Sequence, residues 1–535
     1  MSATTETGAA STAAGTAAST EASTEARMSR REVLQALSGL MVGIFVSILA
    51  ATVVSNALPV IIADLGGSQS IYTWVVTAEL LAMTASVPLW GKLADLVSQK
   101  LLVQLSLTLF VAGSLLAGFS ENTTMLIVAR VVQGLGAGGL TALVQIVMAA
   151  MIPPRELGRY AGIFGAVFAV ATVAGPLIGG VIVDTSWLGW RWCFFMGVPF
   201  ALLAIVLLQK TLKLEQVTRR DVHIDWLGAL LITAGVSTLL IWVTLAGNDF
   251  DWLSGTTALM VGGAVVLLGL ALVVESRVAE PVIPLGIFRN RTVTLTVVAS
   301  ALVGIAMFGG TVFLSQYFQI SLGYSPTEAG LLSLPMIGGL LVSSTVAGAL
   351  ITKTGTWKRF LVAGGVLMTV GFGLLATIDA QTSIWLLGAF MVVLGVGVGL
   401  LMQNLVLAAQ NDVPARELGS ATSVLSFFRS LGGTIGVSVL GAVLASRVAG
   451  DLAVLGGGSA GGGETTVPDV STLPPEVARV VQDAYGDATA ELFLIATPLA
   501  ALALLVVLFI KEKPLKTTSG AERLAEEQAQ LPLAH

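Results

Sequence analysis

Apolar residues occupy the chain in long, nearly uninterrupted runs that short polar connections separate. From Leu34 onward each run has roughly 17 to 28 residues, long enough to cross a hydrocarbon core of about 30 Å as an α-helix at 1.5 Å per residue. The pattern therefore predicts fourteen membrane-spanning helices. Their expected bounds are 34–57, 71–90, 101–119, 125–150, 160–183, 192–208, 226–246, 258–274, 293–320, 329–351, 360–378, 384–409, 419–445 and 492–510.

Polar segments flank these runs and interrupt them once. Residues 1–27 are rich in Ala, Thr, Ser, Gly and Glu and lack the basic start and apolar run of a signal peptide, so we expect residues 1–33 to form a disordered tail. A second tail, 511–535, follows the last span. The connection 446–491 begins with clustered glycines and becomes acidic, which favours a flexible linker over a small folded module.

Composition supports an all-α membrane protein and argues against an enzyme. Hydrophobic residues make up 55% of the chain and charged residues only 11%, whereas soluble domains carry about 25% charge. One cysteine and two histidines exclude a disulfide framework and a Cys/His metal cluster. With no visible cluster of acid, base and nucleophile, we expect no catalytic activity and no cofactor.

Basic residues predict the orientation, because cytoplasmic loops retain Lys and Arg. If the N-terminus is cytoplasmic, all but five of the 27 Lys and Arg residues fall on the cytoplasmic side. Arg191, Arg447 and Arg479 lie outside, and Arg130 and Arg429 lie within predicted spans. An even number of spans then places both termini in the cytoplasm.

An internal repeat relates the two ends of the chain. Residues 152–158 (Ile-Pro-Pro-Arg-Glu-Leu-Gly) match residues 413–419 (Val-Pro-Ala-Arg-Glu-Leu-Gly) at an offset of 261 residues. The repeat predicts two related six-helix halves, 34–210 and 281–510, joined by helices 7 and 8 within 211–280. This arrangement is expected of a transporter whose substrate site lies between the halves.

Several short segments recur in a specific order along the spans. Residues 91–95 (Gly-Lys-Leu-Ala-Asp) form the loop after span 2, and residues 126–138 place Arg130 and a glutamine one turn apart on span 4. Span 5 carries residues 175–180 (Gly-Pro-Leu-Ile-Gly-Gly), which combine small residues for tight packing with a kink. Residues 427–433 (Phe-Phe-Arg-Ser-Leu-Gly-Gly) follow in span 13.

These segments together resemble the major facilitator superfamily, specifically its fourteen-span drug:proton antiporters, from about Leu34 to Ile510. The resemblance implies a switch between conformations at Gly91, Asp95, Gly175, Pro176, Gly179 and Gly180. Two departures stand out: Ala50 replaces the acidic residue usual in span 1, and Ala171 replaces the first glycine of the span 5 motif.

Glu79 is the acidic residue deepest within a span, about 12 Å from its start. A protonated carboxyl is tolerated in an apolar setting and an ionised one is costly, so we predict that Glu79 carries the coupled proton. The alternative is a glutamate in a structural pair or one wetted from outside. Arg130 is its candidate counter-charge, although the resemblance also implies a relay or structural role for this arginine.

Polar and aromatic residues within the spans are the candidates for a substrate cavity. Each amide could instead bond a neighbouring helix, and each aromatic ring could simply pack. Stacking on rings would suit flat lipophilic cations. The predicted lining is Gln145, Phe164, Phe168, Phe313, Gln316, Tyr317, Gln403, Asn404 and Arg429.

The resemblance implies multidrug efflux: a monomeric, proton-driven exporter of lipophilic, often cationic, compounds in a bacterial cytoplasmic membrane, conferring antibiotic resistance. The chain lacks a phosphate-binding loop, because its one Gly-Lys pair is followed by Leu93. Export of an endogenous metabolite, antibiotic, siderophore or lipid is the alternative, and a non-transporting receptor or scaffold is a more distant one. No nucleic acid partner is expected.

Overall fold

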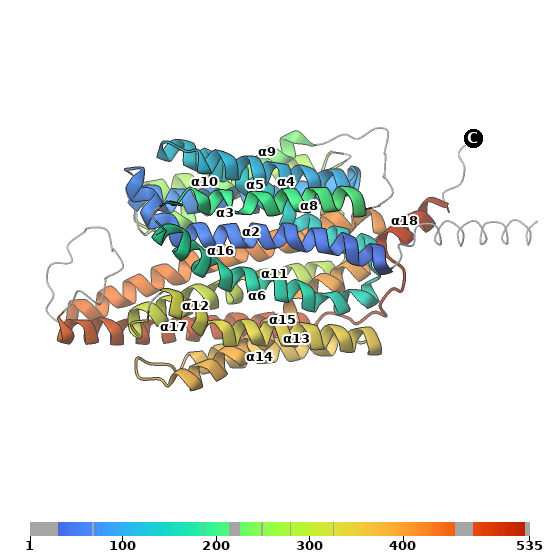
Figure 1. The fold of residues 1–535 in the computed structure, drawn as a ribbon. Coiled ribbons are helices and arrows are strands. Elements are labelled where there is room, and N and C mark those ends of the chain that lie inside the picture. The colour runs from blue at the N-terminus through green and yellow to red at the C-terminus, as the bar shows by residue number, and fades with distance from the viewer. Residues whose placement is uncertain are drawn as a thin grey trace, which may run out of the picture.

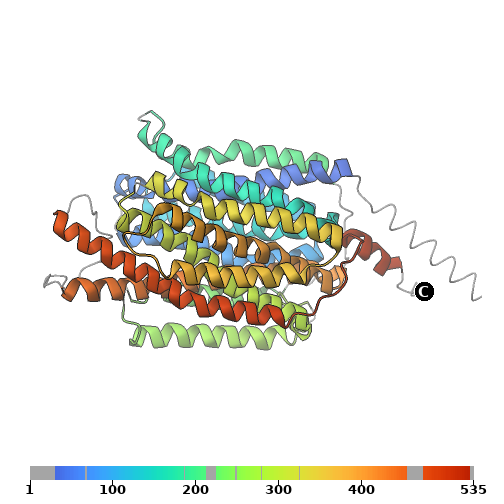
Figure 2. The same cartoon turned by 90° about the horizontal axis from the view of Figure 1, so that it is seen from below.

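The computed structural model describes residues 30–66, 69–185, 187–212, 225–247, 250–278, 280–324, 326–454 and 474–529. Regular structure in these ranges is helical, and the only β-type pairing among them is an isolated bridge between Ala246 and Phe250. The long helices lie side by side along one common direction (Figure 1, Figure 2). The predicted all-α fold class is confirmed.

The helices follow the chain in three groups. The first group, which we call the N-half, contains α2 (Arg30–Asp64), α3 (Gln69–Leu96), α4 (Gln99–Gly118), α5 (Thr123–Met151), α6 (Pro154–Asp184), α7 (Trp192–Phe195) and α8 (Gly197–Thr211). The linking group contains α9 (Trp226–Leu245), α10 (Gly255–Glu275) and the 3-10 helix η1 (Leu285–Arg289). The third group, the C-half, contains α11 (Arg291–Gln316), the π-helix η2 (Tyr317–Ser321), α12 (Pro326–Leu332), α13 (Leu334–Thr354), α14 (Lys358–Leu375), α15 (Ile384–Asp412), the 3-10 helix η3 (Ala415–Glu417), α16 (Leu418–Val454) and α17 (Pro475–Leu508).

Fourteen helical segments of the described chain are long and apolar enough to cross a membrane, and each coincides with one predicted span. Some spans are interrupted. The predicted span 192–208 divides into α7 and α8 at Met196, and the span 329–351 divides into α12 and α13 at Ser333. Pro335 follows this second break at the start of α13, where its missing N–H is tolerated.

The connection 446–491 differs from the expected flexible linker. Helix α16 continues to Val454 and α17 begins at Pro475, so the described residues of this connection are helical apart from Pro474; residues 455–473 lie outside the described part. The extension of α17 is amphipathic, with Val481 and Ala484 buried. Its backbone is tied to the C-half by Ser321, whose hydroxyl donates to the carbonyl oxygen of Gln482 at 2.8 Å. The prediction from apolar runs missed these turns of α17 because the outer face of an amphipathic helix is polar.

The predicted N-terminal tail differs in part from expectation. Residues 30–33 belong to α2, whereas residues 1–29 lie outside the described chain. The C-terminal tail contains α18 (Gly520–Ala529), which lies at one end of the bundle (Figure 1). That tail is therefore structured through residue 529.

The two largest hydrophobic clusters follow the two halves. One is built mainly from α2–α9 and the other from α11–α17. Between the halves, α6 packs against α13 and α16 packs against α3, while α9 contacts both α3 and α16. Figure 1 shows α6 and α16 on the boundary between the two groups. The division at residues 210 and 281 stays a prediction.

Candidate functional site

Glu79 and Arg130 form an ion pair in the interior of the N-half. Oε2 of Glu79 on α3 contacts Nη2 of Arg130 on α5. Only 6% of the Glu79 surface and 2% of the Arg130 surface are exposed. The structure therefore shows Arg130 as the direct counter-charge of Glu79, which was one of the roles predicted for this arginine. Because a lone charge is costly within a membrane, each partner makes burial of the other tolerable.

Two glycines allow α3 and α5 to approach closely at this pair. A Cβ atom on Gly134 would overlap the carbonyl oxygen of Glu79, and one on Gly138 would lie 2.5 Å from the carbonyl oxygen of Met83. Glycines four residues apart share one face of a helix, which is the signature of close helix packing in membranes. A side chain at Gly134 would force the helices apart and lengthen the contact between Glu79 and Arg130.

Hydrogen bonds hold Arg130 independently of Glu79. Its Nη1 donates to Oε1 of Gln133 at 2.7 Å, and its Nε donates to the carbonyl oxygen of Val75 at 3.4 Å. Nε2 of Gln133 in turn donates to Oγ of Ser114 at 2.9 Å. Ser114 was not among the predicted residues, because a lone serine on an apolar span gives no signal. The network keeps the guanidinium in place if the carboxyl of Glu79 becomes protonated.

Glu79 differs in depth from the other buried acids. Four carboxylate residues of the described chain are buried: Glu79, Asp225, Glu275 and Glu522. Asp225 caps the start of α9, and Glu275 is the last residue of α10, where its carboxylate accepts from the backbone N–H groups of Val282 and Ile283. Glu522 lies on α18. Among these four, Glu79 alone lies far from the ends of a membrane-spanning helix.

Asp95 joins the two halves at one end of the bundle. Its Oδ1 accepts from the backbone N–H of Gly419 at 2.7 Å, and its Oδ2 accepts from the N–H and hydroxyl of Ser420 at 2.8 and 2.6 Å. The acceptor lies at the end of α3, and the donors lie at the start of α16. A carboxylate at a helix N-terminus is stabilised by the free N–H groups and the helix dipole. We call this contact the Asp95 clamp.

Gly91 gives the clamp its close approach. A Cβ at this position would overlap the side chain of Ser423 and lie 2.8 Å from the carbonyl oxygen of Gly419. Lys92 beside it pairs with Oε2 of Glu280 at 2.6 Å, which ties α3 to the segment before η1. The predicted residues Gly91 and Asp95 therefore meet the second copy of the repeated segment, at Gly419.

The span 5 motif packs against the first span. A Cβ at Gly175 on α6 would overlap Oγ1 of Thr52 on α2, and that hydroxyl also lies 3.4 Å from the carbonyl oxygen of Ala171. Gly179 is buried and Gly180 is partly buried one turn further along α6; Pro176 belongs to the same helix, and its side chain lies outside the description. Thr52 was not predicted as a partner.

Two small cavities lie between the halves. The first, of about 40 Å³, is lined by Gln145, Met148, Leu157, Gln403, Asn404, Val406, Leu407 and Gln410. The second, of about 20 Å³, is lined by Phe164, Gly165, Phe168, Leu340, Ser344, Gly399, Met402 and Gln403. Such volumes hold water at most, whereas a drug-sized ligand occupies about 300–1,000 Å³. The halves must therefore separate before such a ligand can enter here.

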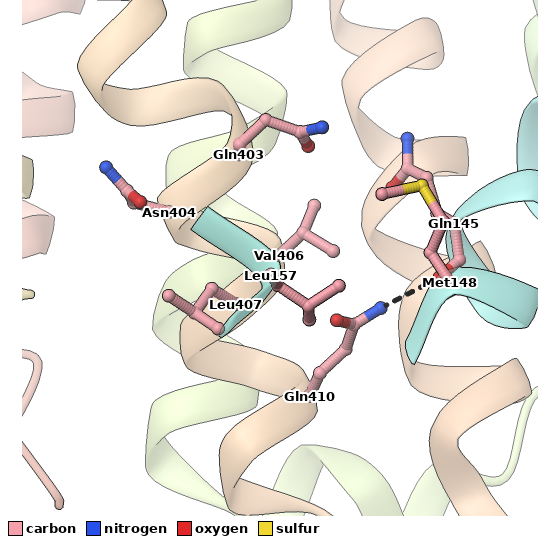
Figure 3. Close-up of a pocket in the computed structure, with 8 residues that line it drawn as sticks. All are labelled: Gln145, Met148, Leu157, Gln403, Asn404, Val406, Leu407 and Gln410. Atoms are coloured by element: carbon pink, nitrogen blue, oxygen red, sulfur yellow. Dashed lines mark hydrogen bonds between the residues drawn. The ribbon is translucent and has the colours of Figure 1, made fainter. Parts of the chain in front are cut away.

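Amide groups dominate the polar lining of the first cavity. Gln403 and Gln145 extend from facing helices into the gap between them (Figure 3). Nε2 of Gln410 donates to Oγ1 of Thr422 at 3.0 Å and to the carbonyl oxygen of Gln145 at 3.5 Å, which joins α15 to α5. Oε1 of Gln145 is buried without a hydrogen-bond partner. Asn404 points to the other side (Figure 3), where its Nδ2 donates to the carbonyl oxygen of Leu400 at 2.7 Å.

The other predicted cavity residues lie elsewhere. Phe313 and Tyr317 are buried in the hydrophobic cluster of the C-half, and the Tyr317 hydroxyl donates to the carbonyl oxygen of Asp379 at 2.6 Å. Gln316 on α11 and the buried Arg429 on α16 line neither cavity. Sequence shows that these residues sit on apolar helices, but it does not show which face of the helix meets the other half.

The described residues contain no group of three or more His, Cys, Asp or Glu side chains arranged to hold a metal ion. Cys193 is buried and has a free thiol. Away from the helix ends, the buried charged groups in this part of the chain are therefore the ion pair of Glu79 and Arg130 and the guanidinium of Arg429 on α16.

A helical bundle of fourteen spans with a buried ion pair and cavities between two halves defines a transporter, and comparison with known proteins gives its family. Residues 40–437 match the model of the Major Facilitator Superfamily. The chain belongs to this superfamily. It is a multi-pass membrane transporter and not an enzyme.

Relatives carry names of the same kind. An uncharacterized MFS-type transporter of Mycobacterium tuberculosis, Rv1877, is 36% identical over 87% of this chain and 67% of its own. The multidrug transporter protein MdtP of Bacillus subtilis is 35% identical over 82% of this chain and 79% of its own. The solved structure of the proton:xylose symporter XylE covers 93% of this chain and 99% of its own with a TM-score of 0.58, and at 14% identity it supports the fold alone.

Proposed function

We propose that this protein is a proton-coupled antiporter that exports lipophilic, often cationic, compounds by alternating access. It would work as a monomer in a bacterial cytoplasmic membrane with both termini in the cytoplasm, driven by the proton gradient without a cofactor. The observation that carries the proposal is the ion pair of Glu79 and Arg130, because it places a proton-binding group deep within a span. Relatives named as an efflux pump, in Gibberella moniliformis, and as a multidrug resistance protein, in Bacillus subtilis, support export as the direction of transport.

The coupling follows from charge balance at the pair. When Glu79 is ionised, Arg130 neutralises it, and the pair has no net charge. When a proton binds Glu79, Arg130 keeps its bonds to Gln133 and Val75 but loses its counter-charge. The site then carries a positive charge that disfavours a nearby cation. Proton binding and cation binding therefore oppose each other, as exchange requires.

The Asp95 clamp supplies the conformational part of the cycle. In the state described here it joins the ends of α3 and α16. The two cavities lined by Gln403 are too small for a ligand of drug size. Opening at this end must break the three hydrogen bonds of Asp95. Hydrogen bonds to a charged group contribute about 1.5–3 kcal/mol each, so the clamp can set the balance between two states.

The test is export of an ethidium-like dye from cells that make the protein, with and without a protonophore. If the proposal is right, export stops when the proton gradient is dissipated while cellular ATP remains high. Continued export under these conditions would remove proton coupling. Cells that do not make the protein, loaded with the same amount of dye, serve as the control.

A second candidate is export of a compound that the cell itself makes. Among the relatives, an Aspergillus aculeatus protein named as the acurin A biosynthesis cluster transporter is 31% identical over 89% of this chain and 88% of its own. The same cycle would serve either substrate. A biosynthetic gene cluster beside the gene, with accumulation of its product after deletion of the transporter, would favour this candidate.

A further inference from the structure

The C-terminal segment after α17 crosses the same end of the bundle as the Asp95 clamp. It leaves α17 after Leu508, continues without regular structure and forms α18 (Figure 1). Leu515 is buried in the C-half cluster, and Ser519 and Arg523 are also buried. Burial of a polar side chain is costly without a partner; Nη1 of Arg523 has one, whereas its Nε and Nη2 have no hydrogen-bond partner among the described residues.

Residues 514–529 bind the C-half through its loop between α15 and α16. Nδ2 of Asn411 donates to the carbonyl oxygen of Pro514 at 3.0 Å, and the N–H of Lys516 donates to Oδ1 of Asn411 at 2.8 Å. Nη1 of Arg523 donates to the carbonyl oxygen of Val413 at 3.3 Å. The N–H of Ala415 donates to Oε1 of Glu527, also at 3.3 Å.

The same segment contacts the N-half. The N–H of Arg155, at the start of α6, donates to the carbonyl oxygen of Lys516 at 3.4 Å. Gly520 lies against the end of α5, where a Cβ would be 2.9 Å from the carbonyl oxygen of Ala149 and 3.0 Å from Cα of Ala150. Backbone atoms cannot move aside as a side chain can, so this contact requires glycine.

Helix α18 is prepared for this position by its own sequence. The N–H of Ser519 donates to Oε2 of Glu522 at 2.6 Å, and the N–H of Glu522 donates to Oγ of Ser519 at 3.2 Å. This reciprocal pair is a capping box, which satisfies N–H groups at a helix start. The capped first turn of α18 carries both Gly520, which lies against α5, and Arg523, which contacts Val413.

The loops that the segment contacts are the two copies of the internal repeat. Residues 152–158 supply Arg155, and residues 413–419 supply Val413 and Ala415. The repeat relates the two halves, and one non-repeated segment lies across both copies. The surface made by these two loops therefore has an occupant within the chain itself.

We propose that residues 514–529 form a latch that docks on the two repeated loops and holds this end of the transporter closed. The proposal rests on the alternating-access cycle proposed above. Because the segment is covalently joined to α17, it remains with the C-half when the halves separate. Opening must therefore break its contacts with Arg155, Ala149 and Ala150, while those with Asn411 and Val413 can persist.

The test measures the distance across this end by electron spin resonance in the full chain with Cys193→Ala. Spin labels replace Arg159 on α6 and Lys353 on α13, two exposed positions beside Arg155 and Thr352, which are joined by a hydrogen bond of 3.4 Å. Two variants undock the latch: truncation after Lys513, which removes the whole segment, and Gly520→Leu. The matched control is Thr517→Leu, which adds the same side chain at an exposed position of the same segment.

We expect both undocking variants to raise the ratio of open to closed distances on the order of tenfold, the scale of an ordinary conformational coupling, and the control to match wild type. Unchanged distances in both variants would overturn the latch. A shift in the truncated chain without a shift in Gly520→Leu would also contradict the latch, because both variants must raise the ratio of open to closed distances. If the wild type shows one distance at every pH and with every dye, alternating access itself fails, which separates that failure from failure of the latch.

Discussion

At the scale of single residues, the interior of this transporter depends on one carboxylate and the groups that make its burial tolerable. Arg130 balances the charge of Glu79, Gln133 and Val75 hold Arg130, and Gly134 brings the two helices together. Ala50 stands where the fourteen-span antiporters usually carry an acid in span 1, which is why we propose the proton site on another helix, at Glu79. A proton role and a structural role for Glu79 make different predictions.

We predict that Glu79→Gln folds but loses uphill export. The amide keeps the shape and accepting oxygen of a protonated carboxyl, but it cannot release a proton. Glu79→Asp should keep part of the activity with a shifted pH optimum. Transport into vesicles at matched protein levels measures both, and thermal unfolding checks the fold. Glu476→Gln, an exposed position on α17, is the matched control. Export by Glu79→Gln at the wild-type rate would assign the carboxyl a purely structural role.

At the scale of helices, close contacts between backbones set where the halves can move. The Asp95 clamp and the latch act at one end, and Gly175 fixes the packing of α6 on α2. These contacts depend on glycines whose neighbours leave no room for a side chain. Each can therefore be tested by adding bulk and comparing with a glycine that has open space.

Gly175→Leu should reduce export strongly while leaving the protein folded. The new side chain would overlap Thr52, and overpacking of this kind costs about 1–3 kcal/mol and shifts the helix. Initial rates of dye export measure the effect. Gly262→Leu on α10 is the control, because nothing lies within 4 Å of a Cβ there. Equal rates in the two variants would show that the tight packing of α6 has no role in transport.

Docking of the latch should strengthen as the pH rises. Burial lowers the pKa of the Lys516 amine from its ordinary value of 10.5, with Arg523 and Lys513 acting in the same direction and Asp412 and Glu527 opposing them. The docked tail thus binds the proton less tightly than the free tail. Docking therefore gains stability as the pH rises through the lowered pKa, and the gain is complete above 10.5. Mobility of a spin label at Thr517 should fall over this range, and Lys516→Met should remove the dependence.

At the scale of the whole molecule, hydropathy was sufficient to predict fourteen spans and the fold class, because lipid contact imposes a long apolar run on every span. It did not predict the first turns of α17 or helix α18, whose outer faces are polar. The capping box at Ser519 and Glu522 was a signal for α18 that the composition of the tail concealed. Among site residues, Gln145 and Gln403 lie at a cavity but Phe313 does not, since the sequence gives the polarity of a position and not the direction of its side chain.

The depth of Glu79 relative to the other buried acids leads to a prediction about the driving force. If Glu79 binds the coupled proton, as proposed above, and one proton enters per cycle, exchange for a singly charged cation moves no net charge. The pH gradient alone should then drive export of a monovalent cation, and nigericin, which collapses that gradient, should stop it. Valinomycin, which collapses the potential, should not.

An uncharged substrate provides the internal comparison. Its exchange for one proton moves one charge, so both ionophores should slow its export. At about 150 mV that charge is worth roughly 3.5 kcal/mol, at 2.3 kcal/mol per 100 mV, which limits the contribution of the potential to a few hundred-fold. Vesicles with imposed gradients and a cationic and a neutral dye measure the two cases. Strong inhibition of monovalent cation export by valinomycin would mean that more than one proton enters, and a second carboxylate would then have to bind it.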